Sequence, residues 1–303
     1  DYDPNDYGAV DSSVWSNFAV NGLYEPGSTF KILTTAMVLE ERVTSADENF
    51  YCPGYQYIGK MKMNCHKKIG HGAETFTQGV ANSCNPVFVE VSRRLGMNKF
   101  YDYLEGFGMT KPTGLDLPGE SEGYISKNYN VANVLTEAFG QYDSYTTIQL
   151  AQYVASIANG GKRVAPHIVG GIYDAGANGS LGTLASTVDT RVLNTLPLDS
   201  EQLGLIQQGF NDVVNSGSSL ATGKAMASSI IPISGKTGTA ETYATDGSGN
   251  SVTTVNLNAV AYATAKDGTK LAVGIMYPHA LDSKSKAQQN AVKSIMELYQ
   301  NTH

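Results

Sequence analysis

Two side chains with complementary acid–base chemistry lie three residues apart in the segment Ser28-Thr29-Phe30-Lys31. On a helix this spacing puts both side chains on one face. A serine hydroxyl is a weak nucleophile until a base accepts its proton, and a desolvated, neutral lysine can be that base. If Ser28 opens the helix, unpaired N–H groups of the first turn would stabilise an oxyanion beside it. Because such a pair also occurs by chance, the hypothesis of a nucleophile and its base needs support from other segments.

Two later segments offer that support. Ser83-Cys84-Asn85 supplies a second hydroxyl that could relay a proton and an amide that could hold a peptide carbonyl. Taken alone, it is also compatible with an ordinary helix cap. Residues 235–239 (GKTGT) place a cation and two hydroxyls where a substrate carboxylate could bind, and Gly238 lets a ligand backbone approach closely. The alternative is a glycine-interrupted edge strand.

Together, the motifs S-x-x-K, S-x-N and K-T-G, in this order and about 50 and 150 residues apart, resemble the active-site set of penicillin-binding proteins and serine β-lactamases. The surrounding sequence resembles the transpeptidase domain of class B penicillin-binding proteins over nearly all of the chain. It is most similar to elongation-type members from Gram-positive bacteria. The matching segments are 24–31 (YEPGSTFK), 114–120 (GLDLPGE), 158–161 (ANGG), 234–241 (SGKTGTAE) and 258–262 (NAVAY).

The resemblance implies an α+β fold of the penicillin-binding protein/serine β-lactamase-like type. An antiparallel sheet flanked by N- and C-terminal helices would adjoin a mostly helical subdomain, with the active site between them. Residues 1–303 would form a single transpeptidase domain. Since the sequence starts without Met, we expect an excised part of a longer protein. It has neither a signal peptide nor a membrane-spanning stretch, so any anchor would lie upstream. The resemblance implies a membrane-anchored protein on the extracytoplasmic face. A cell-wall glycosyltransferase is the expected partner.

The resemblance also implies the reaction. Ser28 would attack the penultimate D-Ala carbonyl of a peptidoglycan stem peptide and release the last D-Ala. An amine of a neighbouring stem peptide would then resolve the acyl-enzyme into a cross-link, whereas β-lactam antibiotics would acylate Ser28 and stall. Lys31 would be the general base and Ser83 a relay. The other motif residues would bind substrate. Asn85 and Thr239 would hold the donor peptide, and Lys236 with Thr237 would hold its carboxylate beside Gly238. The backbone N–H groups of Ser28 and Thr239 would stabilise the oxyanion.

A second cluster of reactive side chains lies between the first two motifs. Cys52, Cys65, His71 and Cys84 are spaced C-x12-C-x5-H-x12-C, and the chain has no other cysteine. Three thiolates and one imidazole suit a structural, tetrahedral Zn²⁺ site, and some elongation-type relatives resemble this sequence in having a metal-binding loop here. His66 is the alternative fourth ligand. A Cys52–Cys65 disulfide with a buried Cys84 thiol, or three unrelated thiols, are the competing interpretations.

The elements that must position these residues follow from hydrophobic periodicity. It predicts helices over 28–41, 75–95 with a break near Pro86, 146–159, 199–215 and 284–301. Strands are predicted over 230–241, 258–264 and 270–277, the last two joined by a hairpin at Asp267-Gly268. Residues 50–72 show no clear periodicity and are predicted to form a loop.

Composition excludes some functions. The sequence has 21 Lys and Arg and 28 Asp and Glu, so its formal charge is −7, and it has no run of basic residues. Neither nucleic acid nor anionic lipid is therefore an expected partner. Residues 119–123 (GESEG) match the nucleophile elbow of α/β-hydrolases, but Pro118 precedes them where a strand is required, which predicts a loop. The segment 235–237 is not a phosphate-binding loop, because Ile230 stands where the first glycine belongs.

Three other functions use the same motifs. A serine β-lactamase of the common class needs a Glu-x-x-Leu-Asn segment for deacylation, which the sequence lacks. A penicillin sensor would be acylated without turnover. A DD-carboxypeptidase would use water as the acceptor with the same residues, so the sequence leaves transfer and hydrolysis open.

Overall fold

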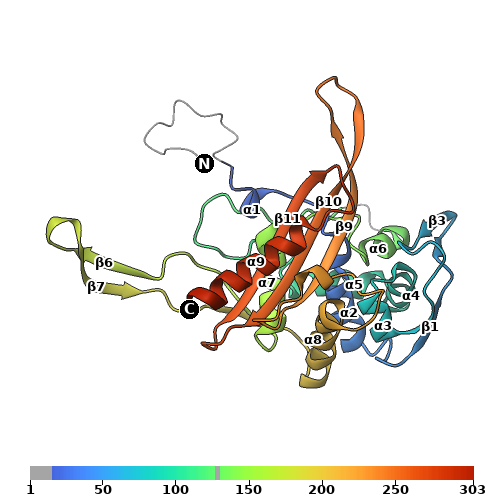
Figure 1. Ribbon diagram of the computed structural model, residues 1–303, viewed down its shortest axis with the longest axis horizontal. Helices are drawn as coiled ribbons and strands as arrows, with labels where there is room; N and C mark the ends of the chain where they lie inside the picture. The colour runs from blue at the N-terminus through green and yellow to red at the C-terminus, as the bar shows by residue number, and fades with distance from the viewer. Residues whose placement is uncertain (1–15, 127–129) are drawn as a thin grey trace.

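The computed structural model describes residues 16–126 and 130–303, and its centre is an antiparallel sheet. Three strands in the order β11-β10-β9 form it: β9 (Ser234–Thr245), β10 (Ser251–Thr264) and β11 (Lys270–Ala280) (Figure 1). All three predicted strands are confirmed, although β9 begins at residue 234 rather than 230 and the other two are longer than predicted. Asp267 closes the predicted β10–β11 hairpin, because its carboxylate accepts a hydrogen bond from Thr269 N at 2.9 Å.

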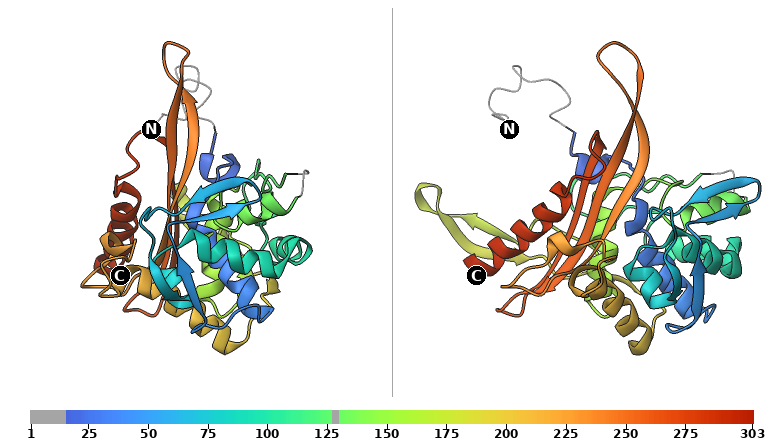
Figure 2. Two further views of the ribbon diagram at one scale, coloured as in Figure 1. Left: turned by 90° about the vertical axis from the view of Figure 1, so that its right-hand side faces the viewer. Right: turned by 45° about the vertical axis from the view of Figure 1, so that its right-hand side comes forward.

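Helices cover both faces of this sheet. Val260 of β10 belongs to a core shared with α7 (Thr147–Ala158), whereas Ala259 and Ala261 join a second core with Val292 and Met296 of α9 (Ala287–Thr302). Successive residues of a strand face opposite sides, which explains this division. In the left view of Figure 2 the sheet is seen edge-on, with α9 on one side and most other helices on the other. The predicted α+β class is confirmed; α1 (Phe18–Asn21) is a short helix that contacts α7.

Capping fixes the starts of two predicted helices. Thr146 and Asp199 accept hydrogen bonds from the N–H groups of Gln149 and Gln202, and both glutamines reciprocate, so α7 and α8 (Ser200–Asn215) begin where the sequence predicts. α9 begins at residue 287 rather than 284, because Lys286 has non-helical dihedral angles.

The helical region beside the sheet consists of α2 (Lys31–Glu40), α3 (Phe76–Ala81), α4 (Asn85–Leu95), α5 (Met97–Gly106) and α6 (Val131–Glu137). The predicted break between α3 and α4 is confirmed, with Pro86 in the first turn of α4, where a proline costs no hydrogen bond. The prediction that the first helix begins at Ser28 is wrong. Residues Gly27–Thr29 form a 3₁₀ turn, η3, and the α-helix starts at Lys31.

The prediction of a loop over residues 50–72 is also wrong. The segment contains β1 (Asn49–Cys52), β2 (Tyr55–Ile58) and β3 (Met61–Asn64), and β4 (Gly72–Thr75) follows and pairs with β1. β2 and β3 form a hairpin around Gly59 and Lys60, where Gly59 has φ +59°. The alternating sequences YQYI and MKMN on either side of Gly-Lys were the overlooked signal.

Two further strand pairs were not predicted: β5 (Lys162–Val164) with β8 (Val192–Thr195), and β6 (Gly171–Ala175) with β7 (Leu181–Thr187). Two short 3₁₀ turns, η4 (Ala177–Gly179) and η5 (Lys224–Met226), lie in the connections β6–β7 and α8–β9. Residues 119–123 are irregular, as predicted.

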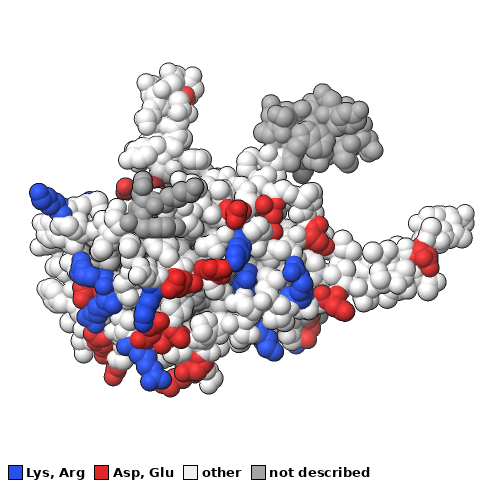
Figure 3. Space-filling view, turned by 180° about the vertical axis from the view of Figure 1, so that it is seen from behind, with Lys and Arg blue, Asp and Glu red and all other residues white. Residues whose placement is uncertain are grey.

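The charge pattern of the surface agrees with the sequence. On the face in Figure 3, Lys and Arg are interspersed with Asp and Glu. Within the described residues, no helix combines the length and the apolar character needed to cross a membrane. The single-domain prediction for residues 1–303 includes 1–15 and 127–129, which lie outside the described residues.

Candidate active site

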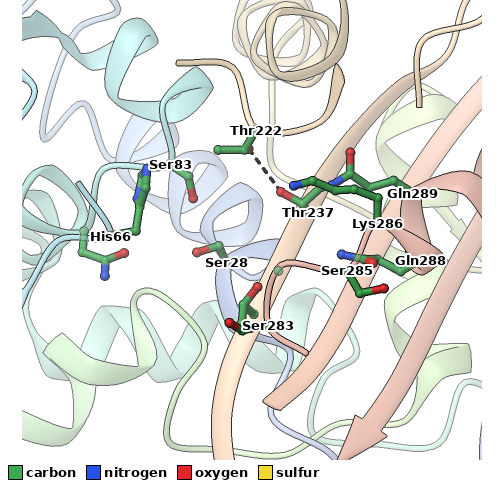
Figure 4. A pocket seen from close by; sticks show the side chains of 13 residues that line it. Ser28, His66, Ser83, Thr222, Thr237, Ser283, Ser285, Lys286, Gln288 and Gln289 are labelled. Atoms are coloured by element: carbon green, nitrogen blue, oxygen red, sulfur yellow. Dashed lines mark hydrogen bonds between the residues drawn. The ribbon is translucent and has the colours of Figure 1, made fainter. Parts of the chain in front are cut away.

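The three predicted motifs meet at one pocket of about 240 Å³ between the edge strand β9 and the helical region (Figure 4). Ser28 comes from η3, Ser83 and Asn85 from the α3–α4 junction, and Thr237 from β9. The lining residues are Ser28, His66, Ser83, Asn85, Thr222, Thr237, Gly238, Thr239, Ser283, Ser285, Lys286, Gln288 and Gln289.

Ser28 is partly exposed on a turn held by backbone contacts on three sides. Gly27 N donates to Gly140 O at 2.8 Å, and Thr29 Oγ1 donates to Pro26 O at 2.8 Å. The buried Tyr153 of α7 donates its hydroxyl to Thr29 O at 2.9 Å. The nucleophile candidate therefore stands on a rigid support rather than on a free loop.

Gly27 and Gly238 bring this turn against β9. Gly27 has φ +56°, and a Cβ there would lie 2.7–2.8 Å from the backbone of Thr239. A Cβ on Gly238 would lie 2.4 Å from Pro26 O. Only glycine permits this approach, which places the backbone of Ser28 beside that of Thr239, as the predicted oxyanion hole requires.

Gly27→Ala is expected to slow acylation of Ser28 by about 100-fold, because a displacement of about 1 Å at a reacting group has that order of effect. The added Cβ must push η3 away from Thr239. Gly59→Ala is the matched control, since Gly59 has φ +59° but no atom within 4 Å of the Cβ position. It should cost only about 1 kcal/mol of stability. Acylation rates and thermal melts of both variants test this, and equal acylation rates would contradict it.

Lys31 is fully buried in the first turn of α2 and does not reach the pocket surface. Its Nζ donates to Ser83 O at 2.7 Å, to Ser83 Oγ at 3.2 Å and to Asn85 Oδ1 at 2.5 Å. Burial lowers the pKa of Lys31 to about 8, against the opposing effect of nearby cysteine and Glu74 charges. A fraction of the side chain is therefore neutral near pH 8, as a general base must be.

Lys236 approaches the same hydroxyl from β9. It is fully buried, and its Nζ donates to Ser83 Oγ at 2.9 Å and to Thr237 O at 3.0 Å. Burial and the neighbouring charge of Lys31 hold the pKa of Lys236 well below its usual value. Because two ammonium groups on one hydroxyl repel each other, at least one of the amines is readily deprotonated. Ser83 bridges the two lysines, which suits a proton relay.

Backbone strain marks the segment that carries Ser83. This residue has φ +54°, a conformation that non-glycine residues rarely adopt and that clusters at functional sites. The hydrogen bond from Lys31 to its carbonyl and one from its own N–H to Val80 O at 3.1 Å hold it in place. The strain turns the Ser83 side chain toward both lysines.

A second cluster lies directly behind this segment. The ligand atoms of Cys52, Cys65, His71 and Cys84 all lie within 4.8 Å of one another. Ligands of a tetrahedral zinc with Zn–S bonds of about 2.3 Å are about 3.8 Å apart, so small movements would complete such a site. His71 belongs to this group, whereas the exposed His66 lines the pocket.

The state of the thiols also suits a cation. All three cysteines are buried free thiols. A hydrogen bond from Cys84 lowers the pKa of Cys65, and the same contact together with burial raises the pKa of Cys84. Burial raises the pKa of Cys52 as well. Without a cation only one thiolate is favoured, and a divalent metal would stabilise the others.

Glu74 connects the cluster to the strained segment. It is 3% exposed and accepts a hydrogen bond from Asn82 Nδ2 at 2.9 Å. Its other oxygen lies 3.6 Å from His71 Nδ1, while His71 Nε2 is buried without a partner among the described residues. His71 Nδ1 also lies 3.7 Å from Cys65 Sγ, so Glu74 adds a negative charge directly beside the cysteine cluster, where a cation would be favoured.

Several pocket residues were not predicted from the sequence. His66, Thr222, Ser283, Ser285, Lys286, Gln288 and Gln289 line the cavity without belonging to the three motifs. They come from three separate segments. His66 was considered from the sequence as the alternative zinc ligand, and the others show no motif or spacing that could have identified them.

The site therefore combines a serine hydroxyl on a rigid turn with two buried lysines that share a second serine hydroxyl. These are the groups that an active-site serine enzyme needs. A family model described as the penicillin binding protein transpeptidase domain matches residues 1–297. The chain therefore belongs to the family of penicillin-binding protein transpeptidase domains, as its sequence motifs predicted.

Individual relatives of the chain are also penicillin-binding proteins or similar in sequence to them. The chain is 34% identical over 305 residues to penicillin-binding protein 2B of Streptococcus pneumoniae, covering 94% of this chain and 44% of that protein. It is 44% identical over 172 residues to stage V sporulation protein D of Bacillus subtilis, covering 55% of this chain and 27% of that protein. The chain thus spans less than half the length of these curated relatives.

Solved structures of penicillin-binding proteins also resemble this chain. A structure of penicillin-binding protein 2B from S. pneumoniae strain R6 matches with a TM-score of 0.84 and 33% identity, over 94% of this chain and 49% of that one. Penicillin-binding protein 3 of Mycobacterium tuberculosis, in complex with aztreonam, matches with a TM-score of 0.76 and 26% identity, over 94% and 65%. The predicted fold family is confirmed.

Proposed function

We propose that the chain is the DD-transpeptidase part of a longer protein and cross-links peptidoglycan. Ser28 forms an ester with the penultimate D-Ala of one stem peptide, the terminal D-Ala leaves, and the amine of a second stem peptide takes the acyl group. The observation that carries this proposal is the convergence of Ser28, Ser83 and the 237–239 strand edge on one pocket. β-Lactams acylate the same serine.

The residues divide the chemical work. A neutral lysine of the Lys31–Ser83–Lys236 chain receives the proton of Ser28 and returns it to the leaving amine. Ser83 transmits the proton, since its hydroxyl accepts from both lysines. The N–H groups of Ser28 and Thr239 stabilise the oxyanion, each contributing about 3 kcal/mol to the barrier reduction. Asn85 and the edge of β9 hold the donor peptide.

Product analysis separates this function from its alternatives. The chain is incubated with a synthetic stem pentapeptide and an amine acceptor, and the products are identified by mass spectrometry. A cross-linked or amine-capped product supports the transpeptidase. Release of D-Ala with only the hydrolysed tetrapeptide indicates a carboxypeptidase, and a stable acyl-enzyme without turnover indicates a sensor.

The acylation rate is expected to rise with pH through about 8, because the pKa of Lys31 is about 8 and only the neutral amine accepts a proton. Below this pH the ammonium form dominates and the rate falls. Stopped-flow acylation by a fluorescent penicillin across this range measures the profile. Lys31→Arg should give a slow, flat profile, since a guanidinium stays protonated. A wild-type rate that is constant or decreases with pH would contradict the assignment.

We also propose a structural Zn²⁺ held by Cys52, Cys65, His71 and Cys84. The metal would contribute folding energy and fix the loop of β1–β4 to Cys84, which lies between Ser83 and Asn85. Support comes from the clustered ligand atoms, the crowded free thiols and the buried carboxylate of Glu74 beside His71. Its chemistry there is structural, because four protein ligands leave no open position.

Two features of the whole protein are proposed with it. A membrane anchor outside this sequence would hold the domain on the extracytoplasmic side, where stem peptides are exposed. A cell-wall glycosyltransferase would supply the glycan strands to be cross-linked. Both rest on the resemblance to the family rather than on a residue of this chain.

A further inference from the structure

A cationic side chain that binds the substrate carboxylate must be accessible at the surface of the pocket. The family resemblance assigns it to Lys236, but this side chain is fully buried and does not line the pocket. Its ammonium nitrogen is already bonded to Ser83 Oγ and Thr237 O. Burial also lowers the pKa of Lys236 well below the usual value, which disfavours its charged form. Lys31 is buried in the same way.

Another cation does reach the pocket. Of the described residues that line it, Lys286 alone carries an ammonium or guanidinium group, and none carries a carboxylate. Lys286 directly precedes α9, and its side chain is exposed. In Figure 4 this side chain extends along the wall of the pocket toward Thr222 and Thr237. The ammonium group thus faces the hydroxyl-rich edge of β9 on the opposite side of the pocket from His66.

The two hydroxyls at this edge form a pair. Thr237 Oγ1 donates to Thr222 Oγ1 at 3.1 Å, which leaves the hydroxyl hydrogen of Thr222 free to donate to a ligand. Thr237 lies on the motif strand, whereas Thr222 lies on the connection between α8 and η5. An anion beside this pair could accept from Thr222 and from the ammonium group together.

The first turn of α9 is fixed to η5, which directly follows this connection. Gln289 is 2% exposed, and its Oε1 accepts a hydrogen bond from Ala225 N at 3.2 Å, three residues after Thr222. The adjacent Gln288 lines the pocket at 3% exposure, and its Oε1 is buried without a partner among the described residues. The hydrogen bond from Ala225 to Gln289 therefore holds the start of α9, and with it Lys286, against the segment that carries Thr222.

We propose that Lys286 is a specificity-determining residue that binds the carboxylate of the donor, with Thr222 and Thr237 as its hydroxyl partners. The ligand class is an acyl-D-Ala donor or β-lactam that carries a free carboxylate next to the scissile bond. The proposal rests on the proposed acylation of Ser28. In this proposal Lys236 acts on the Ser83 relay. The charge that recognises the carboxylate comes from Lys286, which precedes α9 and belongs to none of the three motifs.

The test compares two donors that differ only in charge. One is an N-acyl-D-alanyl thioester whose thioglycolate leaving group has a free carboxylate, and the other is its methyl ester. Lys286→Met should lower kcat/KM for the carboxylate donor by about tenfold or more, the typical effect of losing a charged hydrogen bond, and leave the ester within about twofold. Lys286→Arg should restore part of the discrimination. Lys284→Met removes a lysine of the same loop that does not line the pocket and should change neither value.

The outcomes are distinct. Equal loss for both donors would mean that Lys286 supports the fold of the site, and no loss for either would mean that it does not bind the carboxylate; both overturn the proposal. Absence of acylation of the unsubstituted chain by either donor would instead contradict the proposed function. Thermal melts of the variants confirm that they are folded.

Discussion

Ser28→Ala is expected to abolish covalent labelling by a fluorescent penicillin, a loss of at least about a thousandfold in acylation rate, since the bond-forming oxygen is removed. The partly exposed side chain can be truncated without breaking the contacts that hold η3, which come from Gly27, Thr29 and Tyr153. Stability should therefore stay within about 0.5 kcal/mol of the unsubstituted chain. Gel fluorescence and intact-mass spectrometry measure the labelling.

Ser121→Ala is the control for this experiment. Ser121 lies at the centre of the segment 119–123 that matches a nucleophile elbow, and its hydroxyl donates to Asn21 O at 3.2 Å outside the pocket. It should label like the unsubstituted chain. Undiminished labelling of Ser28→Ala, or loss of labelling in Ser121→Ala, would refute the assignment of the nucleophile.

Removal of the proposed zinc is expected to destabilise the chain by about 4 kcal/mol or more, the effect of a ligand present at about a thousand times its dissociation constant. The melting temperature should fall by on the order of 10 °C. The physical reason is that four side chains from separate segments, all but one of them buried thiols, lose their common partner. Differential scanning fluorimetry with and without a strong chelator measures the shift.

A pair of histidine variants sharpens this experiment. His71→Ala should reduce bound zinc to far less than one per chain, because His71 stands with the three cysteines. His66→Ala should keep its zinc, because His66 is exposed at the pocket. Mass-spectrometric metal analysis of protein purified without added zinc tests both. The absence of zinc from the unsubstituted chain, or its loss in His66→Ala alone, would contradict the proposed ligand set.

Short-range features of the chain were predictable from its residues. The caps at Thr146 and Asp199 and the break before Pro86 depend on groups within four residues of each other, so periodicity and capping rules found them. The β2–β3 hairpin was equally local, but its strands have four residues each, which is too short for a periodic pattern to stand out. β1 and β4 are also short, and they pair across the whole hairpin between them.

The sequence by itself determined the identity of the nucleophile candidate and its motifs, because their types and order are specific. It also determined the ligand candidates, because cysteine is rare in this chain. Only the tertiary structure decided that Lys236 and Lys31 are both buried and contact the same hydroxyl. It also decided that His71 rather than His66 belongs to the cysteine cluster, and that Lys286 lines the pocket. Burial and pKa depend on residues more than 50 positions apart packing together, and no local pattern encodes that contact.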